Sequence, residues 1–156
     1  MTAVSLIDMP PTPATYFRHV GPYGQSVARF WIERVAPSMA ENKLFDRLRF
    51  GLAHDDPTIT DPAKCRYDGC LVADRKEVLC GQPMRSTLPG GRYAGMRFEG
   101  TRRRHRCRVA AFAGRLPTSG PQLDARPMLE RYQVDETFDA RTGVFDCNLC
   151  IPVKPL

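Results

Sequence analysis

The feature that most constrains this chain is a pair of short motifs that occurs twice, about half the chain length apart. Arg18-His-Val-Gly21 returns as Arg97-Phe-Glu-Gly100, which lies 79 positions later. Tyr67-Asp-Gly-Cys-Leu71 returns as Phe145-Asp-Cys-Asn-Leu149, which lies 78 positions later. Two similar offsets in the same order indicate a duplicated structural unit rather than two unrelated halves.

The length of 156 residues fits one domain that contains both copies of this unit. We therefore expect a single domain over residues 1–156, with pseudo-repeats of about 1–77 and 78–156. A chain of this size buries roughly 68–70 % of its unfolded surface, which is enough for a substantial core.

Each half predicts the same order of elements, strand, helix, strand and strand. Gly21-Pro22 suits the start of the first helix, and apolar residues such as Val27 and Phe30 follow the helical period. We expect an α+β fold of tandem β-α-β-β pseudo-repeats, with antiparallel sheets, helices on one side and a central ligand groove at the junction. The expected strands are 14–20, 48–53, 66–73, 92–99, 128–134 and 144–153, and the expected helices are 22–41 and 101–116.

The net charge of +6 comes from one part of the chain. Residues 85–108 hold eight arginines and one acidic residue, Glu99, whereas the remaining residues are close to neutral. This distribution argues against a histone-like protein, in which basic residues recur along the chain. An apolar content of 42 % also argues against disorder as the main state.

No apolar run is long enough to cross a membrane, and the first residues lack the basic and apolar regions of a signal peptide. We therefore expect a cytoplasmic protein whose six cysteines are reduced thiols. Cys147 and Cys150 have CxxC spacing, but a strand directs positions three apart to opposite faces. We expect no metal site and no cofactor.

Six short motifs resemble those of the GyrI-like family, in the same order and spacing and over nearly the whole chain. The same module is similar to the effector-binding domains of some AraC-type and MerR-type transcription regulators. The motifs are Arg18-His-Val-Gly-Pro-Tyr23, Asp55-Asp-Pro57, Cys65-Arg-Tyr-Asp68, Pro89-Gly-Gly-Arg-Tyr-Ala94, Leu129-Glu-Arg-Tyr132 and Ile151-Pro-Val153.

This resemblance implies a small-molecule groove with a key glutamate, which corresponds to Glu130 in the motif Leu129-Glu-Arg-Tyr132. The aromatic residue that opens this motif in the family is replaced by Leu129. We expect a stand-alone protein without a DNA-reading domain, because the matched region fills the chain. Its implied role is to sequester or sense amphipathic, often cationic, compounds.

The residues themselves are compatible with such a groove. Glu130 and Tyr132 share a face of their expected strand because they lie two positions apart. An aromatic wall around one carboxylate suits a flat aromatic or cationic ligand. The alternatives are that Glu130 is an exposed strand residue and that the aromatic side chains only fill the core. The ligand-binding candidates are Glu130, Tyr132, Trp31, Phe30, Tyr67 and Tyr93.

Two other functions stay open. The family resemblance implies a DNA gyrase inhibitor or modulator that acts by protein contact. A glutamate with a raised pKa beside a tyrosine is also compatible with a hydrolase of strained-ring alkylating toxins, with Glu130 as the catalytic group. We regard an enzyme as the less favoured reading, because no Ser-His-Asp pattern and no nucleotide-binding loop is present.

The arginine run needs a separate explanation. Its charges are spread around the expected helix, at the end where the helix dipole disfavours cations. They form either a solvated surface or a surface for an acidic partner, such as gyrase or DNA phosphate. These residues are Arg102, Arg103, Arg104, Arg106 and Arg108.

Overall fold

The computed structural model describes residues 4–81, 83–115, 122–133, 139 and 141–154. Both predicted β-α-β-β units are present, and within the described residues their boundaries agree with the expected ones to within a few residues. The expected helix end at residue 116 and strand end at residue 134 lie outside the described residues. The first unit consists of β2 (Thr12–Val20), α1 (Gln25–Phe30), η1 (Trp31–Val35), α2 (Ala36–Asn42), β3 (Arg49–Ala53) and β4 (Arg66–Val72). The second consists of β6 (Gly91–Gly100), α3 (Arg102–Arg115), β8 (Met128–Tyr132) and β9 (Phe145–Lys154).

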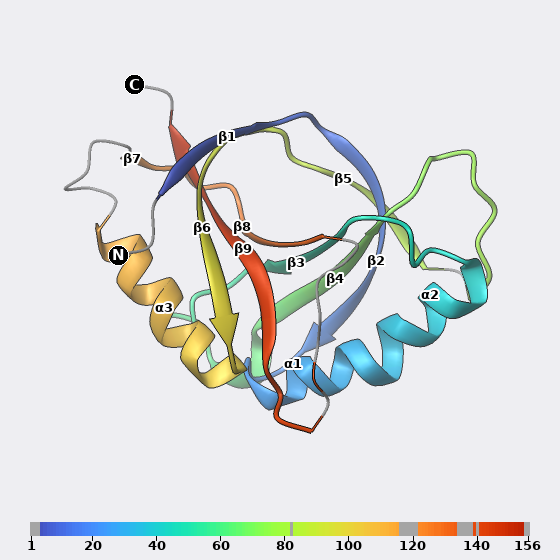
Figure 1. The fold of residues 1–156 in the computed structure, drawn as a ribbon, viewed down its shortest axis with the longest axis horizontal. Helices are drawn as coiled ribbons and strands as arrows, with labels where there is room; N and C mark the ends of the chain where they lie inside the picture. Colours follow the sequence, from blue (N-terminus) through green and yellow to red (C-terminus); the bar gives the residue numbers. More distant parts are fainter. Residues whose placement is uncertain (1–3, 82, 116–121, 134–138, 140, 155–156) are drawn as a thin grey trace.

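The two units form one curved antiparallel sheet, in the order β1-β6-β9-β8-β3-β4-β2-β5. The order is symmetric about the β3–β8 pair, because β6, β9 and β8 mirror β2, β4 and β3. Figure 1 shows the helices along one side of the curled sheet. The expected fold class is therefore confirmed, and the junction of the two units is the pairing of β3 with β8.

Three strands and a short helix were not expected. These elements are β1 (Ser5–Met9), β5 (Met84–Leu88), β7 (Gln122–Leu123) and the 3-10 helix η2 (Pro62–Lys64). β1 precedes the first unit but pairs with β6 of the second. β5 follows the first unit after a long connection and pairs with β2. The N-terminal strand thus crosses from one half of the sheet to the other.

The repeated motifs have the same structural role in both units. Arg18 forms an ion pair with Asp68 at 2.8 Å, and Arg97 forms one with Asp146 at 2.6 Å. Each pair joins the strand before the helix to the last strand of its unit. The glycine that ends each motif also has a positive φ, 147° at Gly21 and 154° at Gly100. This backbone region favours glycine and allows the chain to turn from strand to helix.

The first helix contains a π-helical turn, η1, between α1 and α2. Pro37 lies in the first turn of α2, and its backbone nitrogen has no hydrogen to donate to a carbonyl one turn earlier. A break in the regular hydrogen bonding is therefore expected in the preceding turn. This turn carries Trp31, so the irregular segment presents the only tryptophan of the chain.

The core lies on both faces of the sheet. One face packs against the helices, through residues such as Val27, Met39 and Phe112. Cys147 and Cys150 belong to different core clusters, as the alternation of side chains along β9 requires. No helix of the described residues is long and apolar enough to cross a membrane.

Candidate functional site

Glu130 lies at the centre of the molecule and is only 1 % exposed. It sits on β8, directly across from Gly51 of β3, at the junction of the two units. A Cβ atom at position 51 would overlap both the Glu130 carboxylate and the Tyr67 hydroxyl. The absence of a side chain at Gly51 therefore makes the space in which these two polar groups meet.

Four side chains hold the buried carboxylate. The hydroxyls of Tyr67 and Tyr132 donate to Oε1, the latter at 3.1 Å. Arg102 donates from Nη1 to Oε2 at 2.6 Å, and His105 Nε2 lies 2.6 Å from the same oxygen. A buried carboxylate needs such partners, because removing its charge from water costs several kcal/mol, on the order of the whole stability of a domain.

The charge of Arg102 decides the ionisation of this cluster. Burial alone would raise the pKa of Glu130, but the positive charge of Arg102 and the contacts with His105 and Tyr67 lower that pKa below the usual glutamate range. Burial, together with the charge of Glu130, raises the pKa of Tyr67 well above its usual value. Glu130 is thus held as a carboxylate, and Tyr67 as a hydroxyl donor.

Arg102 reaches this position from the first residue of α3. Its guanidinium stacks 4.1 Å from the centre of the Phe145 ring and donates to the Tyr132 hydroxyl at 2.8 Å. Its side chain is only 10 % exposed. Assigning Arg102 to a surface for an acidic partner was therefore wrong, because Glu130 of the same chain is its acidic partner.

The other members of the arginine run remain outside the site. They are exposed along α3, and only Arg102 and His105 turn toward β8. Residues three apart share a helix face, which explains why these two lie together while the residues between them face solvent. The exposed members are Arg103, Arg104, Arg106 and Arg108.

Trp31 connects the buried cluster to the surface. Its indole Nε1 donates to the Tyr67 hydroxyl at 2.9 Å, and its ring lies 5.4 Å from that of Tyr132 in an edge-on arrangement. Phe30, the preceding residue, is buried and packs edge-on against Tyr67 at 6.2 Å. Phe30 therefore packs against Tyr67 within the core, whereas Trp31 lines a pocket.

A pocket of about 160 Å³ opens beside this cluster, between the first helix and the ends of β3, β8 and β9. We call it the Trp31 pocket. Its charged lining residues are Arg49 and Arg102, and Glu130 lies behind Arg102 rather than at the wall. Its principal apolar and aromatic lining residues are Trp31, Ile32, Met39, Phe45, Tyr132 and Phe145.

Tyr93 does not belong to this site. It is fully buried in the same core cluster as Leu129, the residue next to Glu130 on β8. Because neighbouring residues of a strand point to opposite faces, this cluster lies on the other face of the sheet from Glu130. The Tyr93 hydroxyl donates to the Pro89 carbonyl at 3.0 Å, and Arg126 lies 4.6 Å from its ring centre. Its inclusion among the ligand-binding candidates was wrong.

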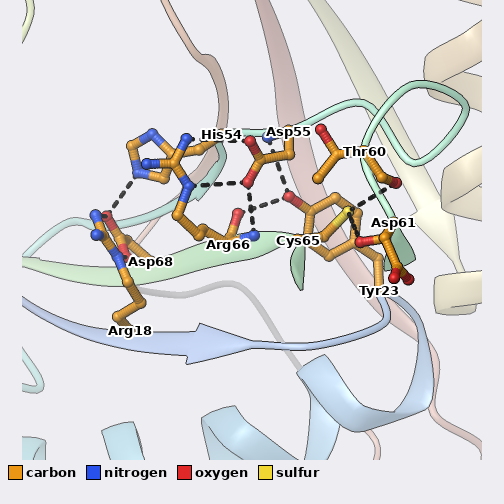
Figure 2. Close-up of polar contacts among 9 residues, drawn as sticks. All are labelled: Arg18, Tyr23, His54, Asp55, Thr60, Asp61, Cys65, Arg66 and Asp68. Carbon is orange, nitrogen blue, oxygen red and sulfur yellow. Dashed lines mark hydrogen bonds and ion pairs between the residues drawn. The ribbon is translucent and has the colours of Figure 1, made fainter. Parts of the chain in front are cut away.

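A second polar cluster contains residues of two of the motifs that resemble the GyrI-like family, Asp55-Asp-Pro57 and Cys65-Arg-Tyr-Asp68. Figure 2 shows Asp68 between Arg18 and His54, with Asp55 paired to Arg66. Burial would raise the pKa of Asp68, but its hydrogen bonds from Arg18 and His54 lower it.

The same cluster fixes the turn that leads into the first helix. Tyr23 donates from its hydroxyl to the Arg66 carbonyl at 2.6 Å, and its oxygen accepts from the Asp55 amide at 3.2 Å. Gly21 donates from its amide to the Cys65 carbonyl at 2.8 Å. These contacts hold the start of α1 against the loop before β4. They position the helix that carries Trp31, and they lie outside the lining of the Trp31 pocket.

The chain is similar to known proteins in sequence and in fold. The family model described as "GyrI-like small molecule binding domain" matches residues 2–154. YosT, an SPbeta prophage-derived candidate transcriptional regulator of Bacillus subtilis (strain 168), is 29 % identical over 160 residues, which cover 98 % of each chain.

Several solved structures share the fold. The C-terminal domain of EcmrR superposes with a TM-score of 0.75 at 13 % identity, covering 100 % of this chain and 99 % of that one. SAV2435 bound to tetraphenylphosphonium superposes with a TM-score of 0.61 at 16 % identity, covering 97 % of this chain and 94 % of that one. At these identities the likeness concerns the fold alone.

Proposed function

Because this chain belongs to the GyrI-like small molecule binding domain family, we propose that it sequesters or senses an amphipathic small molecule in the Trp31 pocket. The observation that carries the proposal is the position of the pocket. It has a wall of aromatic and aliphatic side chains, and its floor is formed by Arg102 and Tyr132, two partners of the buried Glu130. Mostly apolar pockets with a few placed polar groups are typical of small-molecule sites.

Each candidate residue has a defined role in this proposal. Trp31, Tyr132 and Phe145 contact the flat part of the ligand. Tyr67 and Phe30 hold Trp31 and Glu130 in place and do not line the pocket. Glu130 acts through Arg102, because the arginine lies between the carboxylate and the pocket.

The fluorescence of Trp31 gives a direct test. Titration with amphipathic aromatic compounds should change its emission saturably, since Trp31 is the only tryptophan. Ile32→Ala should weaken binding roughly fivefold, because it removes apolar contact from the pocket wall. Ile59→Ala is the matched control, since Ile59 is also exposed but lies outside the lining. Equal affinities of the two variants would exclude the pocket as the binding site.

The second candidate function is modulation of DNA gyrase by protein contact. It rests on the four exposed arginines of α3, Arg103, Arg104, Arg106 and Arg108, which offer a basic surface to an acidic partner. A supercoiling assay tests it, with glutamine at all four positions as the variant. Unchanged gyrase activity at excess wild-type protein would exclude this role.

Hydrolysis of strained-ring toxins has less support. A general acid must hold a proton near neutral pH, whereas Arg102 and His105 lower the pKa of Glu130 despite its burial. Glu130 is also screened from the pocket by Arg102. An intact compound after incubation of a cyclopropane-containing alkylator with the protein would exclude that substrate class.

A further inference from the structure

Arg102 occupies the position next to Glu130 that a cationic ligand would need. Its Nη1 donates to Oε2 of Glu130 at 2.6 Å, and its Nη2 donates to the Tyr132 hydroxyl at 2.8 Å. His105 Nε2 also lies 2.6 Å from the same carboxylate oxygen. The guanidinium stacks 4.1 Å from the centre of the Phe145 ring. The carboxylate that would compensate the positive charge of a ligand is therefore already paired within the chain.

Both members of this ion pair are buried. The side chain of Arg102 is 10 % exposed and that of Glu130 is 1 % exposed. Arg102 lines the Trp31 pocket and Glu130 does not, so the carboxylate lies behind its own counter-charge. A cation could reach the carboxylate only if Arg102 moved away. Such a movement is unfavourable, because it gives up the contacts of a buried charge.

The remainder of the lining is mostly apolar. Arg49, the other charged residue of the described lining, has partners within the chain, among them the Gln133 carbonyl, to which its Nη2 donates at 3.2 Å. A charged ligand would therefore lose its hydration and compete with contacts that the two arginines already make. A cavity of roughly 150 Å³ accommodates a benzene ring. The Trp31 pocket, with about 160 Å³, thus suits a small flat ring system.

We propose that the Trp31 pocket selects neutral molecules with a small, flat apolar body over cations and anions of the same shape, and that Arg102 is the residue that excludes cations. The apolar body packs against Trp31 and Phe145. A neutral ligand needs no counter-charge, so it leaves the buried ion pair intact. This inference rests on the proposed function and narrows the amphipathic ligands of that function to uncharged ones.

Three ligands with one ring system and different charges provide the test. Naphthalene-2-carboxylate, 2-naphthylmethanol and 2-naphthylmethylammonium are titrated by calorimetry into the wild-type protein at neutral pH and low salt. We expect the alcohol to bind about tenfold tighter than either charged ligand, because a buried charge without a counter-charge is more costly than a buried hydroxyl. Equal or tighter binding of the ammonium or the carboxylate would overturn the inference and leave the proposed function in place. Absence of binding by all three ligands would overturn the proposed function itself.

Substitution of Arg102 should create a preference for cations. Arg102→Gln removes the positive member of the ion pair, so the ammonium should bind about tenfold tighter than it does to the wild type, and the carboxylate should bind more weakly. Arg103→Gln is the matched control, because it removes the same charge from the next residue, which is exposed. The control should keep the wild-type order of the three ligands. An Arg102→Gln protein that folds and gains no affinity for the ammonium would contradict the exclusion of cations by Arg102.

A double variant covers the case in which Arg102→Gln does not fold. Combining Arg102→Gln with Glu130→Gln removes both charges, which avoids the cost of leaving one member of a buried ion pair without the other. Because the site then carries neither charge of the pair, the alcohol should again bind most tightly, as in the wild type. A double variant that prefers the ammonium or the carboxylate would show that the ion pair does not set the preference for neutral ligands, and would overturn the inference.

Discussion

Gly51 illustrates how a residue without a side chain determines a site. It faces Glu130 across the β3–β8 pair, and the two polar groups of Glu130 and Tyr67 fill the space that a side chain would occupy. Gly51→Ala should therefore destabilise the protein by about 1–3 kcal/mol, as measured by urea unfolding. The control is Gly114→Ala in α3, where no atom lies near the new methyl group and helix propensity favours alanine by roughly 0.5–1 kcal/mol. Similar stabilities of the two variants would contradict the crowding at Gly51.

Glu130 should dominate the response of the protein to acid. Glu130→Gln leaves Arg102 buried without its counter-charge, which should cost about 3–5 kcal/mol in the free energy of unfolding at pH 7. Because the pKa of Glu130 is lowered in the folded state, its contribution is present above the ordinary value of 4.5 and is lost as the pH falls below it.

Urea unfolding of wild type and Glu130→Gln at a series of pH values measures this effect. The difference between the two proteins should be largest near neutral pH and should shrink progressively below about pH 4.5. Glu99→Gln, at an exposed position of β6, is the control for the loss of one negative charge. A difference that is constant between pH 7 and pH 3 would show that the charge of Glu130 does not stabilise the fold.

The sequence predicted part of this cluster for a physical reason. Alternation along β8 places Glu130 and Tyr132 on one face, and the helical period places Trp31 on the apolar face of its own helix. Alternation does not say which aromatic residue of a distant strand shares that face, so Tyr93 was assigned to the wrong side. Arg102 and His105 were missed because the charges of the arginine run were considered together rather than residue by residue. Their spacing of three residues, which puts both on one helix face, was the available signal.

At the scale of elements, α3 begins with an unfavourable charge distribution. Its first turn holds no acidic residue and three consecutive arginines, close to the positive end of the helix dipole. Arg102 is retained there by Glu130, whereas Arg103 is exposed and has no such compensation from the buried cluster. Arg102 at the start of α3 therefore serves the buried ion pair with Glu130 rather than the stability of the helix itself.

Arg103→Glu should consequently stabilise the protein. The new carboxylate would lie in the first turn, where the dipole favours it by about 0.3–1 kcal/mol. The control is Arg108→Glu in the middle of α3, which changes the net charge equally but lies away from the helix end. Thermal unfolding at low salt should give a higher midpoint for Arg103→Glu than for Arg108→Glu. The reverse order would contradict the dipole explanation.

Elements of the repeats were predictable, because each carries a local pattern. The strands β1 and β5 were not, since their residues are mostly exposed or half-buried and they are defined by pairing with β6 and β2. Such edge strands depend on distant partners rather than on their own periodicity. The π-helical turn at Trp31 was missed as well, although Pro37 gave a signal for a break in the helix.

At the scale of the whole molecule, the duplication makes the strands and helices of the two units correspond to each other, whereas the residues at the junction of the units differ. Both units repeat the arginine–aspartate pair and the turn glycine. At the junction they differ, because one unit contributes Gly51, Trp31 and Tyr67 and the other contributes Glu130 and Arg102. The candidate site therefore draws on both units, because the ion pair, Tyr132 and Phe145 belong to the second unit, whereas Trp31 belongs to the first.

This arrangement leads us to infer that residues 1–156 fold as one cooperative unit. β1 pairs with the second unit, β5 pairs with the first, and β3 pairs with β8 across the junction. Unfolding either half would thus expose unpaired strand edges and apolar surface of the other. Small domains with such shared cores commonly unfold in a single transition.

Urea unfolding with two probes tests this inference. Trp31 fluorescence reports on the junction, and far-ultraviolet circular dichroism reports on the helices and strands of both units. The two curves should coincide, with the same midpoint and slope, and the separate fragments 1–77 and 78–156 should lack stable structure on their own. A fluorescence transition that precedes the loss of secondary structure, or a fragment that unfolds cooperatively alone, would mean that the two units are separable. The site would then assemble by docking of two folded halves, and the burial of Glu130 would depend on that docking rather than on folding itself.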